Sequence, residues 1–416
     1  MDVYIQSARP LVIERAEGTR IFDKNGRSYI DGNSSWWTAL LGHNHPRLVS
    51  ALREQATSLC HVALGGIIHE SAAHLALRLA ALCPGLPHVF FSDNGSTAVE
   101  AAMKMALQYQ AQVGAPARTE FLALDGAFHG ETLGVTALSG VGAFRAPFSS
   151  AIVSARRLPS PADPEVGLEA ALTALECALQ EASTVAALVL EPLVQGAGGM
   201  RVYSPLYLKR ARELTAQAGV LLIVDEVFTG FGRTGTFWAS SQAEIIPDVL
   251  CAAKGLSGGL LPLAATLASS RVFEAFWGGK ERAFYYGHTY AGNPLGTRVA
   301  LEVLSVYEDE NVLGVAQERA QQLALGLERF RAMPGVEQVR SLGMIAAFDL
   351  GGNANYLQPL GWEVYQEALE RGAYLRPLGN VIYAAPPLNI PSADLQELLD
   401  ILEKSVRVVL ERHGAA

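Results

Sequence analysis

The sequence predicts an α/β protein with a mostly parallel central sheet and helices on both faces. Short apolar runs, such as residues 185–190 and 221–224, alternate with longer segments of helical periodicity from about Ser71 onward. Apolar runs without polar alternation are typical of parallel strands that are buried on both faces. No linker or internal repeat interrupts this order, and strand–helix alternation is the arrangement of such a sheet.

The composition is that of a globular enzyme. Of 416 residues, 50% are hydrophobic and 18% are charged, which leaves room for two domains and a large core. The net charge of -9, without a cluster of basic residues, argues against a nucleic-acid partner. The long uncharged run 255–270 is too short for a membrane span, and charges break up the N-terminal residues. We therefore expect a cytoplasmic protein with no secretory signal and no membrane contact.

The cysteines give no sign of a metal site or a disulfide framework. Cys60, Cys83, Cys177 and Cys251 are scattered along the chain and lack the spacing of metal ligands. Reduced thiols are usual in cytoplasmic proteins. We expect these cysteines to be buried and reduced, and we predict no bound metal.

The N-terminal residues predict a β-hairpin followed by an aromatic segment. An Asn-Gly pair at positions 25 and 26 lies between two strand-like runs, 20–23 and 28–31, and Asn-Gly is the strongest short signal for a hairpin turn. The sequence SSWW follows, with Trp36 beside Trp37. The pair is either a hydrophobic plug under a loop or the aromatic wall of a substrate pocket.

A candidate anion site lies between the strand expected at 88–92 and the helix that follows it. Gly95, Ser96 and Thr97 lie at the start of this helix. Unpaired backbone N–H groups and the helix dipole favour a phosphate at such a position. The alternative is ordinary capping of the helix by Ser96 or Thr97.

A candidate cofactor contact follows the strand expected at 120–124. Phe128 lies beside His129 in a glycine-flanked loop, where an aromatic ring is able to stack on a planar cofactor. The alternative for His129 is a structural histidine, and we do not expect it to be a catalytic base. Residues 150–164, rich in proline and serine, are expected to form a surface loop.

Two carboxylates and a lysine follow apolar strands. Asp225 and Glu226 come directly after the run 221–224, and Lys254 follows the run 249–253. Ligands bind at the carboxyl ends of parallel strands, so these groups are expected to face one pocket. A carboxylate can hold a protonated pyridine ring while an amine forms a Schiff base with the aldehyde of pyridoxal phosphate. The alternative is an acid pair that caps the following helix or binds a metal.

The last part of the chain predicts a smaller α+β domain. Beyond about Asn311 the pattern changes to helices with short strands. Arg376 lies there between apolar residues, and it is either paired structurally or placed to bind a carboxylate in a fork. We expect an N-terminal segment (1–50) that packs with the small domain, a large cofactor-binding domain (51–310) and the C-terminal small domain (311–416).

Several motifs occur in the order of a known family. The sequence VDEVFTGFGRTG, Lys254 within AAKG, and HTYAGNP from His288 onward resemble the class III pyridoxal-phosphate aminotransferases of fold type I. The resemblance covers nearly the whole chain. It implies pyridoxal 5'-phosphate as the cofactor, small-molecule substrates and a homodimer with shared active sites.

The resemblance also implies roles for individual residues. Lys254 is expected to form the Schiff base and move the proton, and Asp225 is expected to pair with the ring nitrogen. The other implied cofactor contacts are Gly95 and Ser96 to the phosphate, Phe128 on the ring, and His288 and Thr289 to the phosphate in the other subunit. The implied substrate contacts are Tyr4, Trp36, Trp37, Phe128, Gly287 and Arg376, with weaker candidates at Glu131, Arg233 and Tyr383.

Within the family, SSWW, EPLVQGAGGMRVYSP and LRPLGNVIY resemble one branch. Its members transfer an amino group from S-adenosylmethionine to 8-amino-7-oxononanoate in biotin synthesis, which implies a two-substrate ping-pong reaction. The chain departs from this branch at three positions, where Phe128 replaces tyrosine, Glu131 replaces aspartate and His288 replaces proline. Lysine as the donor, or a class III activity on other ω-amino acids or diamines, is the alternative.

Overall fold

A seven-stranded sheet forms the centre of the protein, in a computed structural model that describes residues 10–352 and 358–414. The strand order is β4-β12-β11-β10-β7-β5-β6. The strands are β4 (His88–Ser92), β5 (Glu120–Leu124), β6 (Ala155–Leu158), β7 (Val185–Leu190), β10 (Leu221–Asp225), β11 (Val249–Ala252) and β12 (Ala264–Ala268). Neighbours from β11 to β6 run parallel, whereas β12 runs antiparallel to β11 and β4. The predicted mostly parallel sheet is confirmed.

Helices cover both faces of this sheet because successive strand residues point to opposite sides. In β10, Leu221 and Ile223 pack with α5 (Gly95–Gln112), and Leu222 and Val224 pack with the opposite layer. That layer contains α4 (Glu70–Leu82), α8 (Gly167–Gln180), α9 (Pro205–Ala218) and α11 (Pro294–Asp309). These four strand side chains are fully buried, so β10 is anchored on both faces up to its last residue.

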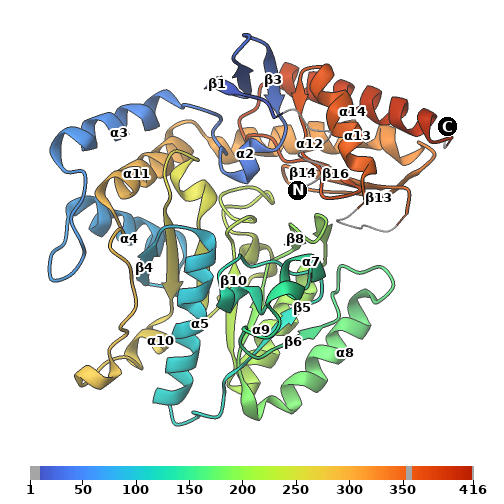
Figure 1. Ribbon diagram of the computed structural model, residues 1–416. Coiled ribbons are helices and arrows are strands. Elements are labelled where there is room, and N and C mark those ends of the chain that lie inside the picture. Colours follow the sequence, from blue (N-terminus) through green and yellow to red (C-terminus); the bar gives the residue numbers. More distant parts are fainter. Residues whose placement is uncertain (1–9, 353–357, 415–416) are drawn as a thin grey trace.

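Two smaller sheets lie beside the large one, and one of them joins N-terminal strands to a strand from the C-terminal part of the chain (Figure 1). The N-terminal sheet contains β1 (Ile13–Glu17), β2 (Arg20–Asp23) and β3 (Ser28–Asp31), and β3 pairs in parallel with β15 (Ala373–Tyr374). The other contains β13 (Val336–Leu342), β14 (Ile345–Leu350) and β16 (Val381–Ala384), near α12 (Val312–Arg331), α13 (Leu360–Glu370) and α14 (Ser392–Arg412). The predicted hairpin is confirmed as β2 and β3. The division of the chain at residues 50 and 310 stays a prediction.

Short elements connect these layers. The helices are α2 (Ser34–Trp37), α3 (Pro46–Ser58), α6 (Leu133–Thr136), α7 (Gly142–Arg145) and α10 (Ser270–Glu274). The strands β8 (Val194–Gln195) and β9 (Arg201–Val202) pair with each other. The 3₁₀ helices are η1 (Ala146–Phe148), η2 (Ala182–Thr184), η3 (Ala239–Ala243), η4 (Lys254–Ser257) and η5 (Lys280–Arg282).

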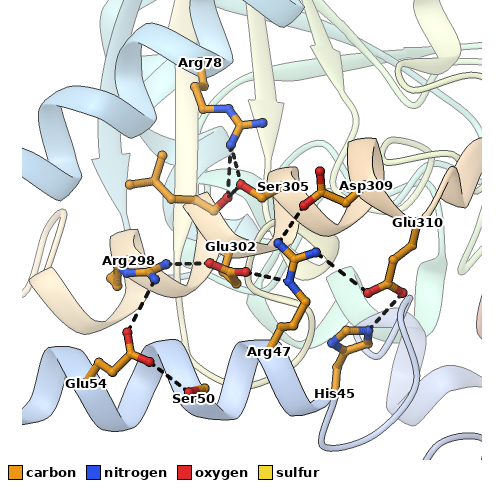
Figure 2. Close-up of polar contacts among 11 residues, drawn as sticks. His45, Arg47, Ser50, Glu54, Arg78, Arg298, Glu302, Ser305, Asp309 and Glu310 are labelled. Carbon is orange, nitrogen blue, oxygen red and sulfur yellow. Dashed lines mark hydrogen bonds and ion pairs between the residues drawn. The ribbon is translucent and has the colours of Figure 1, made fainter.

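A network of ion pairs fixes α3 on α11 (Figure 2). The guanidinium of Arg47 lies 2.8 Å from Glu302 and 2.9 Å from Asp309, and that of Arg298 lies 2.9 Å from Glu302. The side chain of Glu302 is only 16% exposed, so solvent screens its two ion pairs less than it would at an open surface. Residues 38–45 connect the tryptophan pair to α3, so the network fixes the helix that follows this connection.

The expected surface loop at 150–164 is wrong in part. It contains β6, the edge strand of the large sheet. The side chains of Arg156 and Arg157 lie in the middle of this strand and concealed it from an apolar pattern. Edge strands commonly carry charged side chains, which discourage pairing with other chains.

The expectation that all cysteines are buried is also wrong. Cys83 and Cys251 are buried, whereas Cys60 and Cys177 are exposed. Cys177 lies on the exposed side of α8, as does Thr173 one turn before it, so the apolar residues around it in the sequence did not predict its burial. In the described ranges, no helix is long and apolar enough to cross a membrane.

Candidate active site

A cavity of about 640 Å³ opens at the carboxyl ends of the parallel strands. Segments that are far apart in the sequence meet there: the end of β10, the residues just after β4, β5 and β11, and the tryptophan segment. The predicted site residues that line this cavity are Trp36, Trp37, Gly95, Ser96, Phe128, Glu131, Asp225 and Lys254. Most of the predicted site is thus brought together in one place.

Lys254 follows β11 and presents an amine inside this cavity. The Nζ atom lies 4.5 Å from the ring centroid of Trp37 and 5.8 Å from that of Phe228. Burial lowers the pKa of Lys254 from 10.5 to about 8, while the negative charges of Asp225 and Glu191 act in the opposite direction. A neutral amine, the form that attacks a carbonyl carbon, is therefore available near neutral pH.

The lowered pKa of Lys254 leads to a testable pH profile. Reductive methylation of the cofactor-free protein with formaldehyde and cyanoborohydride modifies uncharged amines. We expect modification of Lys254, measured by peptide mass spectrometry, to rise with a midpoint near pH 8. In the Asp225→Asn protein the midpoint should move lower, because the Asp225 charge favours the ammonium form. A midpoint near the ordinary value of 10.5 in the wild type would contradict this description of the amine.

Asp225 is held in a fixed orientation. Its Oδ1 accepts a hydrogen bond from Val227 N at 3.1 Å, and its Oδ2 lies 2.8 Å from Nδ1 of His129. The His129 side chain is fully buried, and its Nε2 has no hydrogen-bond partner among the described residues. The sequence did not predict this pair, because the two residues are 96 positions apart. The structural alternative for His129 thus takes a specific form, since its imidazole orients the carboxylate that lines the cavity.

Glu226, the neighbour of Asp225, has a different function. It is fully buried and accepts hydrogen bonds from the backbone N–H groups of Ala239 (3.0 Å) and Ser240 (2.8 Å) and from the hydroxyl of Thr229 (2.7 Å). Burial raises the pKa of Glu226 in spite of these bonds. Capping therefore describes Glu226, which accepts from the first two residues of η3, whereas Asp225 accepts one backbone N–H group and also lines the cavity. No group of residues able to hold a metal ion is present in the described parts of the chain.

The N-terminus of α5 has a different cap from the expected one. Asn94 accepts a hydrogen bond from Thr97 N at 3.0 Å and forms a capping box with Thr97. The hydroxyl of Ser96 is not used for capping, and it accepts from Glu131 N at 3.1 Å. A Cβ atom at Gly95 would lie 2.7 Å from Val227, so a side chain there would displace Val227. Chain segments thus approach closely around the first turn of α5, as in an anion cradle.

Phe128 is tied to a carboxylate that the sequence analysis missed. The backbone N of Phe128 donates to Oε1 of Glu191 at 2.9 Å, and Gly196 N donates to Oε2 at 2.9 Å. Burial raises the pKa of Glu191 to about 7. The signal was present, since Glu191 comes directly after the apolar strand β7 as Asp225 ends β10. Glu191 and Phe128 both line the cavity.

The two tryptophans have different surroundings. Trp37 is buried, with its ring centroid 4.5 Å from that of Phe228, and its Nε1 donates to the hydroxyl of Tyr383 at 3.2 Å. Trp36 is 55% exposed and lies against Arg376, whose Cζ is 4.2 Å from the ring centroid. Both tryptophans line the cavity, so they form a wall of it, and Tyr383 supports that wall from behind.

Other expected site residues lie elsewhere. Gly287, His288 and Thr289 are exposed and do not line the cavity of their own chain, although His288 Nε2 lies 3.7 Å from Oδ1 of Asp93, which does. Arg233 is not a wall residue. It is fully buried, and its Nη1 donates to the carbonyls of Met344 (2.9 Å) and Pro386 (2.7 Å). Tyr4 lies outside the described residues.

Comparison with known proteins identifies the family. The family described as aminotransferase class-III matches residues 3–406 of the chain. The chain belongs to this family. A relative from Synechococcus elongatus, named adenosylmethionine-8-amino-7-oxononanoate aminotransferase, is 44% identical over 398 residues, which are 94% of this chain and 93% of the relative. A relative of the same name from Geobacter sulfurreducens is 40% identical over 97% of this chain and 93% of its own.

Solved structures agree with this assignment. The enzyme of the same name from Methanocaldococcus jannaschii is 33% identical, with a TM-score of 0.92 over 97% of this chain and 94% of that one. An amine transaminase from an uncultivated Pseudomonas species, solved with pyridoxal phosphate bound, is 34% identical, with a TM-score of 0.91 over 97% of both chains. The predicted fold type I architecture is confirmed.

The cofactor of this class III aminotransferase is pyridoxal phosphate. The cavity fits the group by its chemistry. It contains an amine whose pKa burial lowers, an oriented carboxylate and the N-terminus of a long helix, which favours a phosphate. The ring of Phe128 supplies an aromatic surface in the same cavity.

Proposed function

We propose that this aminotransferase transfers an amino group from S-adenosylmethionine to 8-amino-7-oxononanoate, giving 7,8-diaminononanoate for biotin synthesis. Several relatives over nearly the whole chain are named for these two compounds. The observation in this structure that carries the proposal is the contact of Arg376 with Trp36 at 4.2 Å. Trp36 lines the cavity, and Arg376 lies against its ring without being a lining residue itself. The contact combines a cation with apolar surface, which suits a long apolar keto acid that ends in a carboxylate.

In this proposal Lys254 and Asp225 carry the chemistry. Bound pyridoxal phosphate supplies an aldehyde that takes up amino groups and a ring that accepts the electrons of the adjacent carbon. Lys254 would hold the aldehyde of the cofactor through its amine, and the free amine would remove and return the substrate proton. Asp225, oriented by His129 and Val227, keeps the ring nitrogen protonated. Both half-reactions use these groups, so the first product leaves before the keto acid binds.

Three further residues hold the cofactor in this proposal. Gly95 and Ser96 bind the phosphate at the start of α5, where free N–H groups and the helix dipole favour an anion. Phe128 would supply the aromatic surface for the ring, and its backbone is fixed by Glu191. Phe128 has no hydroxyl, so it contributes stacking and no hydrogen bond to cofactor or substrate.

The proposed assembly is a homodimer in the cytoplasm, with active sites that share residues. Gly287 and Thr289 are exposed in the single chain and lie outside its own cavity, which suits residues that contribute to the site of a second copy. The aromatic side chains on either side, Tyr285 and Tyr290, are 79% and 61% exposed. Exposed aromatic side chains of this size are typical of an interface.

A class III activity on simple ω-amines is the second candidate. The specific observation in its favour is the 34% identity to an amine transaminase, about the same as to the enzyme from Methanocaldococcus jannaschii. A third possibility keeps the keto acid and takes lysine as the donor. Phe128 bears on the choice between the two amino donors. It replaces a tyrosine of the related branch, so a polar donor has no hydroxyl to bind at this position.

Half-reactions in a spectrophotometer distinguish these candidates. Protein loaded with pyridoxal phosphate is mixed separately with S-adenosylmethionine, lysine and a simple ω-amine. We expect S-adenosylmethionine to convert the visible absorbance of the bound cofactor, and 8-amino-7-oxononanoate to restore it. Conversion by lysine alone would change the donor and keep the acceptor. Conversion by the ω-amine alone, without turnover of 8-amino-7-oxononanoate, would refute the proposal.

A further inference from the structure

The segment that carries both tryptophans is one turn of left-handed helix. The φ angles from Ser34 to Trp37 are 49°, 48°, 63° and 72°. Trp37 N donates to Asn33 O at 2.8 Å, and Thr38 N donates to Ser34 O at 2.9 Å, which are helical bonds between residues four apart. A left-handed turn is disfavoured for residues with side chains, and glycine is absent here. Other groups must therefore stabilise it.

The carboxylate of Asp31 accepts hydrogen bonds from the start of this turn. It is 1% exposed. Its Oδ1 accepts from Asn33 N at 3.1 Å, and its Oδ2 accepts from Ser35 N at 2.6 Å. Nε2 of His43 lies 2.9 Å from the same Oδ2. Two backbone N–H groups of the turn thus point to one buried carboxylate, which fixes the backbone angles between them.

A second set of contacts ties the turn to the C-terminal part of the chain. The hydroxyl of Ser34 donates to Ala385 O at 2.7 Å and accepts from Nη2 of Arg233 at 3.3 Å. Oδ1 of Asn33 accepts from Arg376 N at 2.5 Å. These bonds explain why Arg233 is buried away from the cavity. They also place the turn next to the arginine that contacts Trp36.

The two tryptophans depend on the turn to different degrees. Trp37 is buried and has its own hydrogen bond to the hydroxyl of Tyr383. Trp36 is 55% exposed, and its ring contact is with Arg376. A relaxed turn would therefore move Trp36 more than Trp37, and it would disturb substrate binding more than the reacting amine of Lys254.

We propose that Asp31, oriented by His43, is a positioning residue that sets the substrate wall through the left-handed turn. Asp31 is not among the described residues that line the cavity, and it acts through Trp36 and its contact with Arg376. The identity of the keto acid in this inference rests on the proposed function, whereas the dependence of the turn on Asp31 does not.

The decisive test compares a variant that weakens substrate binding with a double variant that should restore it. Asp31→Asn keeps the size of the side chain but replaces an acceptor oxygen with an NH₂ group. We expect the KM for 8-amino-7-oxononanoate to rise about tenfold while kcat changes less than about threefold. Ser35→Gly removes only an exposed side chain, and glycine adopts positive φ without steric cost. The double variant should therefore recover most of the wild-type KM.

A second readout needs no turnover. Acrylamide quenching of tryptophan fluorescence should increase in Asp31→Asn and return toward the wild-type value in the double variant. In protein that already carries Trp36→Phe, Asp31→Asn should cause no such increase. If the wild type does not use 8-amino-7-oxononanoate, the proposed function fails, and quenching still tests the turn. Unchanged KM and quenching in Asp31→Asn would overturn the inference.

The matched control is another buried acid. Asp248 immediately precedes β11 and is 6% exposed. It accepts a hydrogen bond from Leu222 N and forms ion pairs with Arg212 (2.9 Å) and Arg271 (2.7 Å). Asp248→Asn should lower the urea midpoint and leave KM and quenching unchanged. A KM change of equal size in Asp248→Asn, or no rescue by Ser35→Gly, would show a general effect on stability and overturn the positioning role.

Discussion

Lys254→Ala is expected to reduce transamination in both half-reactions by at least about a thousandfold, because it removes a nucleophile and a proton-transfer group together. Lys254 is the lysine of the cavity lining, and none of the other described lysines lines it. Its pKa of about 8 makes part of the amine neutral near physiological pH. The measurement is single-turnover absorbance of the cofactor-loaded variant with each substrate.

The same variant should fold normally. Burial lowers the pKa of Lys254 from 10.5 to about 8. Below pH 8 the lysine is charged in both the folded and the unfolded protein, and burying this charge destabilises the folded protein. This destabilisation decreases as pH rises from about 8 to 10.5, because in that range the folded protein has lost the proton while the unfolded protein still carries it. Removal of the amine therefore should not lower the urea midpoint at pH 7.

Two comparisons make the Lys254→Ala result specific. Lys209→Ala changes an exposed lysine of α9 and should leave both half-reactions unchanged. Added methylamine should restore part of the activity of Lys254→Ala, because the cavity gains space for a small base. Transamination at a rate near the wild type in Lys254→Ala would refute the assigned chemistry.

The sequence could predict the ends of the strands, because the information there is local. Asp225 and Lys254 each follow an apolar run of strand length, and the parallel order brings such ends to one edge. Glu191 follows the same rule after β7 and could have been found by applying it again. The glycine-flanked loop predicted Phe128 as a cofactor contact, but nothing in the sequence indicated that its backbone binds Glu191.

Other parts of the site could not be predicted, because they depend on contacts between distant segments. The pairing of His129 with Asp225 needs two strand ends in register. The left-handed turn has no glycine, so no residue type indicates its backbone, and it persists because Asp31 and residues near Ala385 hold it. Arg233 was misplaced because the resemblance implied its role, while its actual partners, Met344, Pro386 and Ser34, come from segments far from it in the sequence.

Asp225→Asn is expected to reduce kcat about a hundredfold or more in both half-reactions, with a smaller effect on stability. The amide keeps the size of the carboxylate and can still accept from Val227 N, which bonds to Oδ1 in the wild type. It loses the negative charge that keeps the ring nitrogen protonated in the proposed mechanism. Stopped-flow absorbance with saturating substrate measures this change separately from KM.

Glu226→Gln is the matched comparison, because it makes the same charge change one residue later. Glu226 is fully buried and accepts from Ala239 N, Ser240 N and the Thr229 hydroxyl. An amide group leaves at least one of these donors without an acceptor, at a cost of about 1–3 kcal/mol in the free energy of unfolding. We therefore expect a lower urea midpoint and a kcat near the wild type for Glu226→Gln, the reverse of Asp225→Asn. Equal losses of kcat in both variants would mean that the two carboxylates do not have separate roles, and that orientation by His129 does not distinguish Asp225.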